Sequence, residues 1–411
     1  MMNLSIKQFQ QVQRKINLEI RKITIVTGVN GIGKTNISKL LYCLLKSNCY
    51  NRCEPALETV NEKIVYLLKK LQSLHNIDFN LDYYEDDNQY YYIDNYMELK
   101  DEFIKDNLRL YKDYSEDFEL IDKLIKIVSD DSIELHVSLL RTFLMRMFDS
   151  NIFTGEICLS QNDCDDVYNV NFTDYDFYDD DFLDYSGNCC VYDNVFYIDN
   201  SGTVLDYIDC TGIFSCDHVN SINDSLHVNN TTLFDGDVNK DLIVLEDELV
   251  DIIGGVFEFN DMGRLVFNSN DGIVSSLSCT SGGVRNLGVL YLLLHNRQIT
   301  GDSFIIFDEV ENNLHPELQL VFAKWLCKLV EKVGVHVYVN SKSPLFIEAI
   351  EVFSRKHRLD EDTSYILLDY CKDGQIKSLH FDYNGLFRLY NNLGDPYDII
   401  DEQRVQNILN L

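Results

Sequence analysis

One stretch of the chain, ITIVTGVNGIGKTNISKLLYCLL at residues 23–45, constrains the fold more than any other part. The four residues ITIV predict a buried strand, and the apolar residues after Lys34 recur at helical spacing. Between them, Gly28, Gly33, Lys34 and Thr35 match the pattern G-x-x-x-x-G-K-[ST]. A strand, a glycine-rich loop and a helix in this order are typical of a phosphate-binding loop.

Each part of such a loop has a physical role. Glycine permits positive φ angles and close backbone approach, so that successive N–H groups point at one anion. The helix that follows adds the positive end of its dipole. We expect Lys34 to reach the β- and γ-phosphates of ATP and the Thr35 hydroxyl to bind Mg²⁺. The predicted nucleotide-binding residues are Gly28, Asn30, Gly31, Gly33, Lys34, Thr35 and Asn36.

A second motif lies in GDSFIIFDEVENNLHPELQ at residues 301–319. The apolar residues Phe304 to Phe307 predict a buried strand that ends on Asp308 and Glu309. We expect Asp308 to share Mg²⁺ with Thr35, and Glu309 to orient and deprotonate the water molecule that attacks the γ-phosphate.

A third motif, SCTSGGVRNLGVLYLLLHN, lies just before the second, at residues 278–296. Ser281 is a typical helix N-cap, and the two glycines after it expose backbone N–H groups at the start of an apolar helix. The motif predicts either a second anion site or an ordinary capped helix. Its place between the phosphate loop and the acid-tipped strand favours the anion site.

The predicted fold class is α/β, a P-loop NTPase head with a mixed sheet flanked by helices and a large insertion. Two short runs near the start, LSIKQF and INLEI, predict a small antiparallel layer beside the main sheet. NVFYIDNSGTVLDYID is expected to rejoin the main sheet, and GVFEFNDMGRLVFNSNDGIV predicts a hairpin and a further turn. The expected divisions are the first part of the head (1–50), a helical insertion serving as an arm or lid (51–150), an acidic Tyr/Asp-rich insertion (151–195) and the rest of the head (196–411).

The acidic insertion has three interpretations: a solvated surface, a calcium site, or a docking surface for a basic partner. Lys and Arg are absent from residues 147–239. The Asp spacing fits no EF-hand loop, and the interleaved aromatic residues favour a folded segment with an acidic face. Cys210, Cys216 and His218 lie near one another, but their spacing matches no familiar zinc pattern.

The formal net charge of −32 disfavours long-range attraction to nucleic acid, so any contact with DNA would need a local basic patch or a second protein. Because ATP is also an anion, the phosphate loop must be locally positive. Twelve cysteines without a C-x-x-C pair, and a start that does not look like a signal peptide, predict a reduced, cytoplasmic protein. No apolar run approaches the roughly 20 residues that span a bilayer, so no membrane partner is expected.

The order of these motifs resembles the ABC-type ATPase heads of the RecF, structural-maintenance-of-chromosomes (SMC) and overcoming-lysogenization-defect (OLD) group. The resemblance covers roughly residues 1–50 and 240–411 and rests on GVNGIGKT, TSGGVRN, FIIFDEVENNLHPELQ and NSKSPLFIEAIE. DEVENNLHP is similar to the group's DEPExxLHP and differs from the DEPTSALD of transporter heads, which implies a stand-alone ATPase. About 60 residues follow NSKSPLFIEAIE. This is too few for the nuclease domain that often follows such heads, so none is expected.

The resemblance also implies a homodimer or higher oligomer in which two copies enclose two ATP molecules. The signature residues that would face the partner's γ-phosphate are Ser281, Gly282, Gly283 and Arg285. Asn312–His315 would lie along the seam between subunits. The group's THSP or SHSP segment has a histidine where VNSKSPLF places Lys342, so hydrolysis is expected to be slow. The implied catalytic residues are Glu309, Lys34 and Lys342.

Two functions follow as hypotheses. The first is an ATP-driven sensor or scaffold in bacterial anti-phage defence that acts through a separate effector protein, for example a nuclease. The alternative is a RecF-like repair or recombination ATPase that binds duplex DNA, with SRKHR at residues 354–358 as the dense basic cluster. A transporter motor is a weaker third hypothesis because its coupling segments are not visible. The sequence leaves direct nucleic-acid binding open.

Overall fold

The computed structural model describes residues 1–7, 9, 15–49, 64, 67–71, 96–115, 118, 121–122, 133–148, 155–161, 167–172, 183–186, 192–199, 217–227, 240–260, 264–371, 373, 375–381, 385–386 and 389–390. The chain divides into two compact units. One consists of Met1–Asn48 with Arg141–Leu411, and the other of Cys49–Leu140. Cys210, Cys216 and much of the acidic run between residues 173 and 191 lie outside the described residues.

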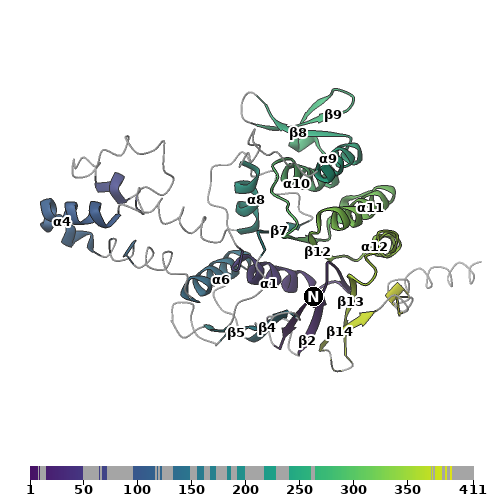
Figure 1. Cartoon of the computed structure of the whole chain (residues 1–411), viewed down its shortest axis with the longest axis horizontal. Coiled ribbons are helices and arrows are strands. Elements are labelled where there is room, and N and C mark those ends of the chain that lie inside the picture. Colours follow the sequence, from purple (N-terminus) through teal and green to yellow (C-terminus); the bar gives the residue numbers. More distant parts are fainter. Residues whose placement is uncertain are drawn as a thin grey trace, which may run out of the picture. The chain divides into compact units, whose positions relative to one another are not determined.

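The first unit is built on a six-stranded mixed sheet, as the sequence predicts (Figure 1). Five strands run parallel, and the edge strand β14 runs antiparallel to β13. In spatial order the strands are β14 (Ile376–Phe381), β13 (Thr363–Tyr370), β3 (Ile23–Gly28), β12 (His336–Asn340), β11 (Ser303–Asp308) and β7 (Asn194–Asp199). The central strands β3 and β11 are buried along their whole length, because helices cover both faces of a sheet with parallel strands.

One face of this sheet packs against α1 (Lys34–Lys46), which follows β3 directly. The helix buries the apolar residues whose spacing predicted it, and its Tyr42 ring packs edge-on against Tyr197 of β7, with 5.9 Å between ring centroids. The predicted strand, loop and helix at residues 23–45 are therefore confirmed.

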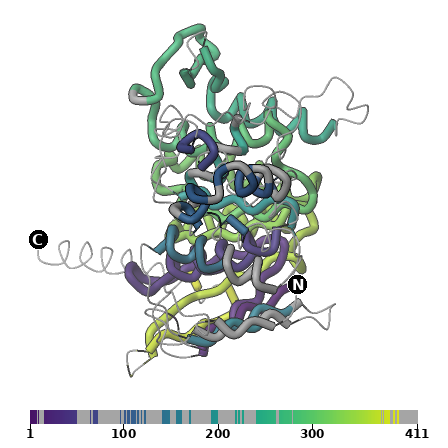
Figure 2. Tube along the Cα trace, turned by 90° about the vertical axis from the view of Figure 1, so that its left-hand side faces the viewer, coloured from purple at the N-terminus to yellow at the C-terminus, as the bar shows by residue number. Residues whose placement is uncertain are grey.

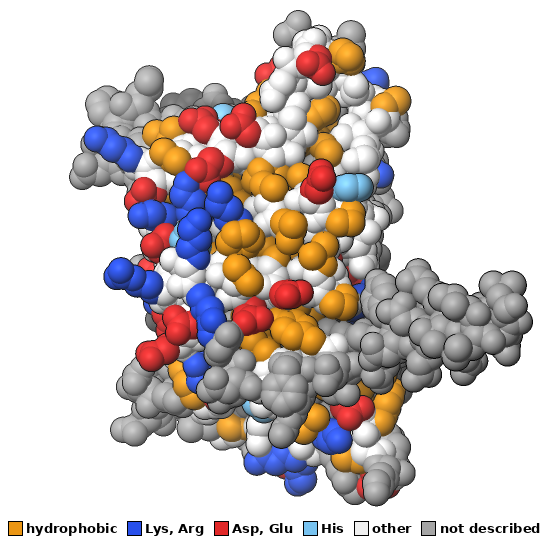
Figure 3. Space-filling model, turned by 90° about the vertical axis from the view of Figure 1, so that its right-hand side faces the viewer, with side chains coloured by type: hydrophobic (Ala, Val, Ile, Leu, Met, Phe, Trp, Pro, Cys, Tyr) orange, Lys and Arg blue, Asp and Glu red, His pale blue; other side chains and the backbone are white. Residues whose placement is uncertain are grey.

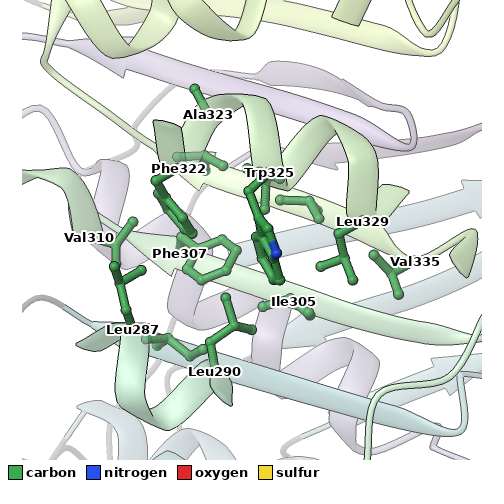
Figure 4. Packing of buried hydrophobic residues seen from close by; sticks show 14 of the residues in the cluster. Leu287, Leu290, Ile305, Phe307, Val310, Phe322, Ala323, Trp325, Leu329 and Val335 are labelled. Carbon is green, nitrogen blue, oxygen red and sulfur yellow. The ribbon is translucent and has the colours of Figure 1, made fainter. Parts of the chain in front are cut away.

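The opposite face packs against a row of helices (Figure 1). They are α9 (Lys240–Ile253), α10 (Gly282–His295), α11 (Pro316–Val333) and α12 (Pro344–Lys356). Figure 4 shows side chains of α10 and α11 meeting those of β11 in one apolar cluster, including Leu287, Leu290, Ile305, Phe307, Phe322 and Trp325. The buried Trp325 indole donates its N–H to the Leu245 carbonyl, which ties α11 to α9.

A second sheet of the first unit has five antiparallel strands, and it confirms the antiparallel layer expected at the amino-terminal end. Its order is β2 (Ile16–Ile20), β1 (Met2–Ile6), β4 (Gly155–Gln161), β5 (Val167–Phe172) and β6 (Leu183–Ser186). The described strands of 151–195 thus extend this layer, a pairing that the sequence did not suggest. Strand β2 lies beside β14 of the main sheet, where Ser378 Oγ donates to the Asn17 carbonyl over 2.9 Å (Figure 2).

A three-stranded antiparallel sheet lies against α9 and α10. It consists of β8 (Gly255–Phe259), β9 (Leu265–Ser269) and β10 (Val274–Ser276), followed by the short 3₁₀ helix η4 (Leu277–Cys279). This arrangement confirms the predicted hairpin and the turn after it. The expected return of residues 194–209 to the main sheet is confirmed for β7, which is followed by α8 (Asp217–His227).

In the second unit, Cys49–Leu140, the described residues are helical apart from Cys49 and a turn at Tyr114. Helix α4 (Tyr96–Asp113) bends at Asn107, and its Phe103 ring lies 5.4 Å from Phe118. Helix α6 (Ile133–Phe148) begins in this unit and ends in the other. Within the part of the chain that the structure describes, no helix has both the length and the apolar character needed to cross a membrane.

Candidate functional site

The loop between β3 and α1 has the conformation that its glycines make possible. Gly28 has a φ of 149°, and a Cβ atom there would lie 2.5 Å from the Leu368 carbonyl oxygen. Gly33 caps α1 in the left-handed region, with a φ of 100°. Other residues rarely adopt such φ angles, so both positions depend on glycine. Asn30 and Gly31 are exposed at the tip of the loop, and Asn36 is half-buried in the first turn of α1.

Lys34 is folded back over this loop. Its Nζ atom donates to the carbonyl oxygens of Gly28 over 2.6 Å and Val29 over 3.2 Å. Burial lowers the pKa of Lys34, although the nearby carboxylate of Glu309 acts in the opposite direction. An anion placed in the loop would favour the charged ammonium, because an opposite charge stabilises it.

Asp308, at the carboxyl end of β11, is the centre of a buried hydrogen-bond network. The Thr35 hydroxyl lies 3.0 Å from its Oδ2 atom, the Tyr197 hydroxyl lies 3.1 Å from the same atom, and Asn340 Nδ2 donates to Oδ1 over 2.8 Å. Asn340 Nδ2 also donates to Ser38 Oγ over 2.8 Å. Burial, followed by the charge of Asp308, raises the pKa of Tyr197, which keeps this hydroxyl protonated as a donor.

The structure therefore brings together Thr35 and Asp308, the two predicted Mg²⁺ ligands, and adds three residues that the sequence analysis missed. They are Ser38, Tyr197 and Asn340. Asn340 could have been noticed, since it is a polar residue at the end of an apolar strand, VYVN. Tyr197 carried no such signal, because only the pairing of β7 with β11 places it there. That pairing also sets Asp199 opposite Asp308.

Glu309 directly follows β11 and adopts a left-handed backbone, with a φ of 57°. This conformation costs a non-glycine residue about 1–3 kcal/mol and is often found at functional sites. Its carboxylate accepts hydrogen bonds from Lys342 Nζ over 2.8 Å and from Asn312 Nδ2 over 2.7 Å. Burial alone would raise the pKa of Glu309, but these two hydrogen bonds and the charges of Lys342 and Lys34 lower it below its ordinary value.

Ser281, Gly282 and Gly283 form the start of α10. Ser281 Oγ accepts a hydrogen bond from the Val284 backbone N–H over 3.4 Å, which confirms the predicted N-cap. The helix start packs closely on the 3₁₀ helix η5 (Val310–Asn313), because a Cβ at Gly283 would lie 2.5 Å from the Asn313 carbonyl oxygen. Arg285 lies in the first turn of α10 and is half-buried.

His218 lies on α8 (Asp217–His227). Its Nδ1 atom is 3.3 Å from the Met147 sulfur, and its Nε2 atom is 3.6 Å from the Asp199 carboxylate. Among the described residues, no group of three or more His, Cys, Asp and Glu side chains could hold a metal ion.

A glycine loop joins a buried strand to a helix, and Thr35 of that helix contacts the acid at the end of another parallel strand. This arrangement defines the P-loop NTPase fold. The predicted fold class, α/β with a mixed sheet flanked by helices, is confirmed. The roles of the individual residues remain predictions.

The solved structures that resemble this chain include SMC heads and an ATP-binding cassette. An SMC head bound to the C-terminal winged-helix domain of ScpA matches 94% of this chain and 98% of its own, at 12% identity and a TM-score of 0.46. An SMC head with an extended coiled coil, from a complex with a ScpA domain from Pyrococcus furiosus, matches 96% and 100%, at 11% identity and a TM-score of 0.44. A dimeric ATP-binding cassette bound to ADP and phosphate matches 92% and 98%, at 10% identity and a TM-score of 0.31.

No family model and no curated protein matches the chain. At such TM-scores the structural likenesses do not bear on the chemistry of the site.

The Lys342–Glu309 ion pair predicts a stability difference that depends on pH. The pKa of Glu309 lies below its ordinary value of 4.5, so its contribution to stability is present above pH 4.5 and is lost as the pH falls through the folded-state pKa. Lys342→Met should therefore destabilise the nucleotide-free protein above pH 4.5. At lower pH, the unfolding curves of Lys342→Met and of the parent should converge. Chemical denaturation across this range tests this, with Lys342→Arg as the charge-preserving control. A difference in the free energy of unfolding between the parent and Lys342→Met that is constant at all pH values would contradict the prediction.

Proposed function

We propose that this protein binds and slowly hydrolyses ATP, and that two copies close around the nucleotide. The observation that carries the proposal is the contact between the Thr35 hydroxyl and the Asp308 carboxylate, which joins the phosphate loop to the acid-tipped strand. These two oxygen ligands fit Mg²⁺, which binds one or two protein oxygens together with phosphate oxygens and water. The ion would neutralise phosphate charge.

The residues of the chain would act in the following way. Backbone N–H groups of the loop would bind the phosphates, and Lys34 would exchange the carbonyls of Gly28 and Val29 for phosphate oxygens. Glu309 would orient a water molecule and accept its proton. Since a general base works best with a pKa near the working pH, the lowered pKa of Glu309 makes it a weak base. This supports slow hydrolysis.

Dimer closure would bring Ser281, Gly282, Gly283 and Arg285 of one copy to the γ-phosphate held by Lys34 of the other. Two features support this proposal. Ser281 is exposed at a capped helix start, where N–H groups can bind an anion. The same helix start packs on η5, which follows Glu309 directly, so a ligand at one site can influence the other.

The motif resemblance supports a sensor or scaffold role in bacterial anti-phage defence, with a separate effector protein as partner. If the protein purified from its native operon were fully active without a partner, this proposed role with a separate effector would be contradicted.

A surface observation favours duplex DNA binding by a RecF-like ATPase as a second candidate function. Lysines recur every four residues along the outer side of α11, and α12 ends nearby, where His357 pairs with Glu331. Figure 3 shows Lys and Arg side chains gathered beside apolar ones on this face. The basic residues are Lys324, Lys328, Lys332, Arg355, Lys356 and Arg358. A local patch of this kind could offset the net charge of −32.

If this face binds DNA, replacing both Lys324 and Lys332 with Ala should reduce the slope of log affinity against log salt by about 2, since each phosphate contact contributes about 0.9. Fluorescence anisotropy with a labelled duplex at several salt concentrations measures the slope. An unchanged slope, or no binding at low salt, rejects this candidate.

Calorimetry tests ATP binding directly. Titrating ATP with Mg²⁺ into the protein should release heat, and Lys34→Ala should weaken binding about 100-fold or more, because hydrogen bonds to charged groups are each worth roughly 1.5–3 kcal/mol. Lys46→Ala, at the end of the same helix, is the matched control and should bind like the parent. Absence of heat with the parent protein would refute the proposed function.

Size-exclusion chromatography tests closure of the dimer. Glu309→Gln should retain ATP and elute as a dimer with it, because binding persists while hydrolysis slows by about 10²–10⁴-fold. Adding Ser281→Ala should shift this variant toward monomer while calorimetry still detects ATP. Thr280→Ala, which removes the neighbouring hydroxyl, should leave the dimer intact. Hydrolysis by Glu309→Gln at the parent rate would show that another group activates water.

A further inference from the structure

The last residue of β12 and the turn that follows it contact three acids: Asp308 at the end of β11, Glu309 next to it and Glu311 in η5. Asn340 donates to Asp308, Ser341 donates to Glu311, and Lys342 pairs with Glu309. The first and third contacts involve residues of the proposed ATP site. The second involves Glu311, which has no role in the function proposed above.

Glu311 is a fully buried acid. Its Oε1 atom accepts hydrogen bonds from Ser341 Oγ over 2.7 Å and from the Lys342 backbone N–H over 3.3 Å. Its Oε2 atom is buried and has no hydrogen-bond partner among the described residues. A buried ionised carboxylate with an unpaired oxygen is costly. In agreement, burial raises the pKa of Glu311, and this effect exceeds the lowering by the hydrogen bond from Ser341.

The contacts of Glu311 determine where the Lys342 side chain begins. The carboxyl group holds the Ser341 hydroxyl and the Lys342 N–H together, and the Lys342 ammonium then reaches the Glu309 carboxylate over 2.8 Å. The Lys342 side chain is 41% exposed, so without this anchor it would be free to sample other rotamers.

We propose that Glu311 is a positioning residue, whose buried carboxyl group fixes the Ser341–Lys342 turn so that the Lys342 ammonium rests on the Glu309 carboxylate. Its effect on catalysis rests on the proposed ATPase function, whereas its effect on Lys342 does not. A residue that only stabilised the fold would contribute to the free energy of unfolding without changing the environment of the Lys342 amine.

The first test needs no nucleotide. The protein is treated briefly with N-hydroxysuccinimide acetate, and acetylation of Lys342 is measured by mass spectrometry relative to the exposed Lys324. Glu311→Ala and Ser341→Ala should each raise Lys342 labelling about threefold, because a partly exposed ion pair shifts the population of the held amine by about this factor, and a released amine is more accessible to the reagent. Glu311→Gln keeps an acceptor oxygen of the same reach for the Ser341 hydroxyl and the Lys342 N–H, so it should label like the parent.

Ser341→Ala keeps the buried acid in place and decides the outcome if Glu311→Ala does not fold. The proposal would be overturned if Lys342 were labelled as in the parent both in Ser341→Ala and in every folded preparation of Glu311→Ala. Unchanged circular dichroism shows that a preparation is folded. A rise in Glu311→Gln equal to that in Glu311→Ala would also overturn it.

The second test is a double-mutant cycle on ATP hydrolysis. Ser341→Ala should change kcat and its pH profile in the parent, and this change should disappear in a Lys342→Met background, because both substitutions act on one pair. Equal effects in the two backgrounds would overturn the proposal. If the parent hydrolyses no ATP, the proposed ATPase activity fails, and the labelling experiment alone decides the role of Glu311.

Discussion

The Asp308 carboxylate connects three elements at the carboxyl edge of the main sheet. It accepts hydrogen bonds from Thr35 of α1, Tyr197 of β7 and Asn340 of β12. A buried charge is tolerated only when its lone pairs are satisfied, so each of these elements must keep its register against β11. The phosphate loop, the acid-tipped strand and the β12–α12 turn are thereby held in one place before a ligand binds. This preorganisation is what a phosphate-transfer site needs.

The charge at this site differs from that of the whole chain. The net charge is −32, yet Lys34 and Lys342 both lie close to the Glu309 carboxylate. Lys34 is held by backbone carbonyls and Lys342 by Glu309, so both ammonium groups have partners that a triphosphate could replace. Binding would then exchange internal contacts for contacts with the ligand, which limits the gain in free energy from each lysine.

The lysine that stands in place of the expected histidine also affects Glu309. Its ammonium helps to lower the pKa of this carboxylate, which under the proposed mechanism would make Glu309 a weak base. The left-handed backbone at Glu309 and the Asn312 hydrogen bond fix the same carboxylate from the other side. Under the proposed function, such a site would hydrolyse ATP slowly.

Local sequence was sufficient to predict the elements that depend on chain neighbours. Glycine spacing predicted the loop at Gly28 to Gly33, Ser281 predicted the cap of α10, and apolar runs predicted β3 and β11. Glycine conformations, caps and side-chain periods act within a few residues, so they can be seen without a partner strand. The tertiary structure alone decided the pairing of β4 with β1, the contact of Tyr197 with Asp308 and the burial of Glu311. These features depend on strand order and on how distant segments pack, and the sequence pattern around each residue carries no information about either.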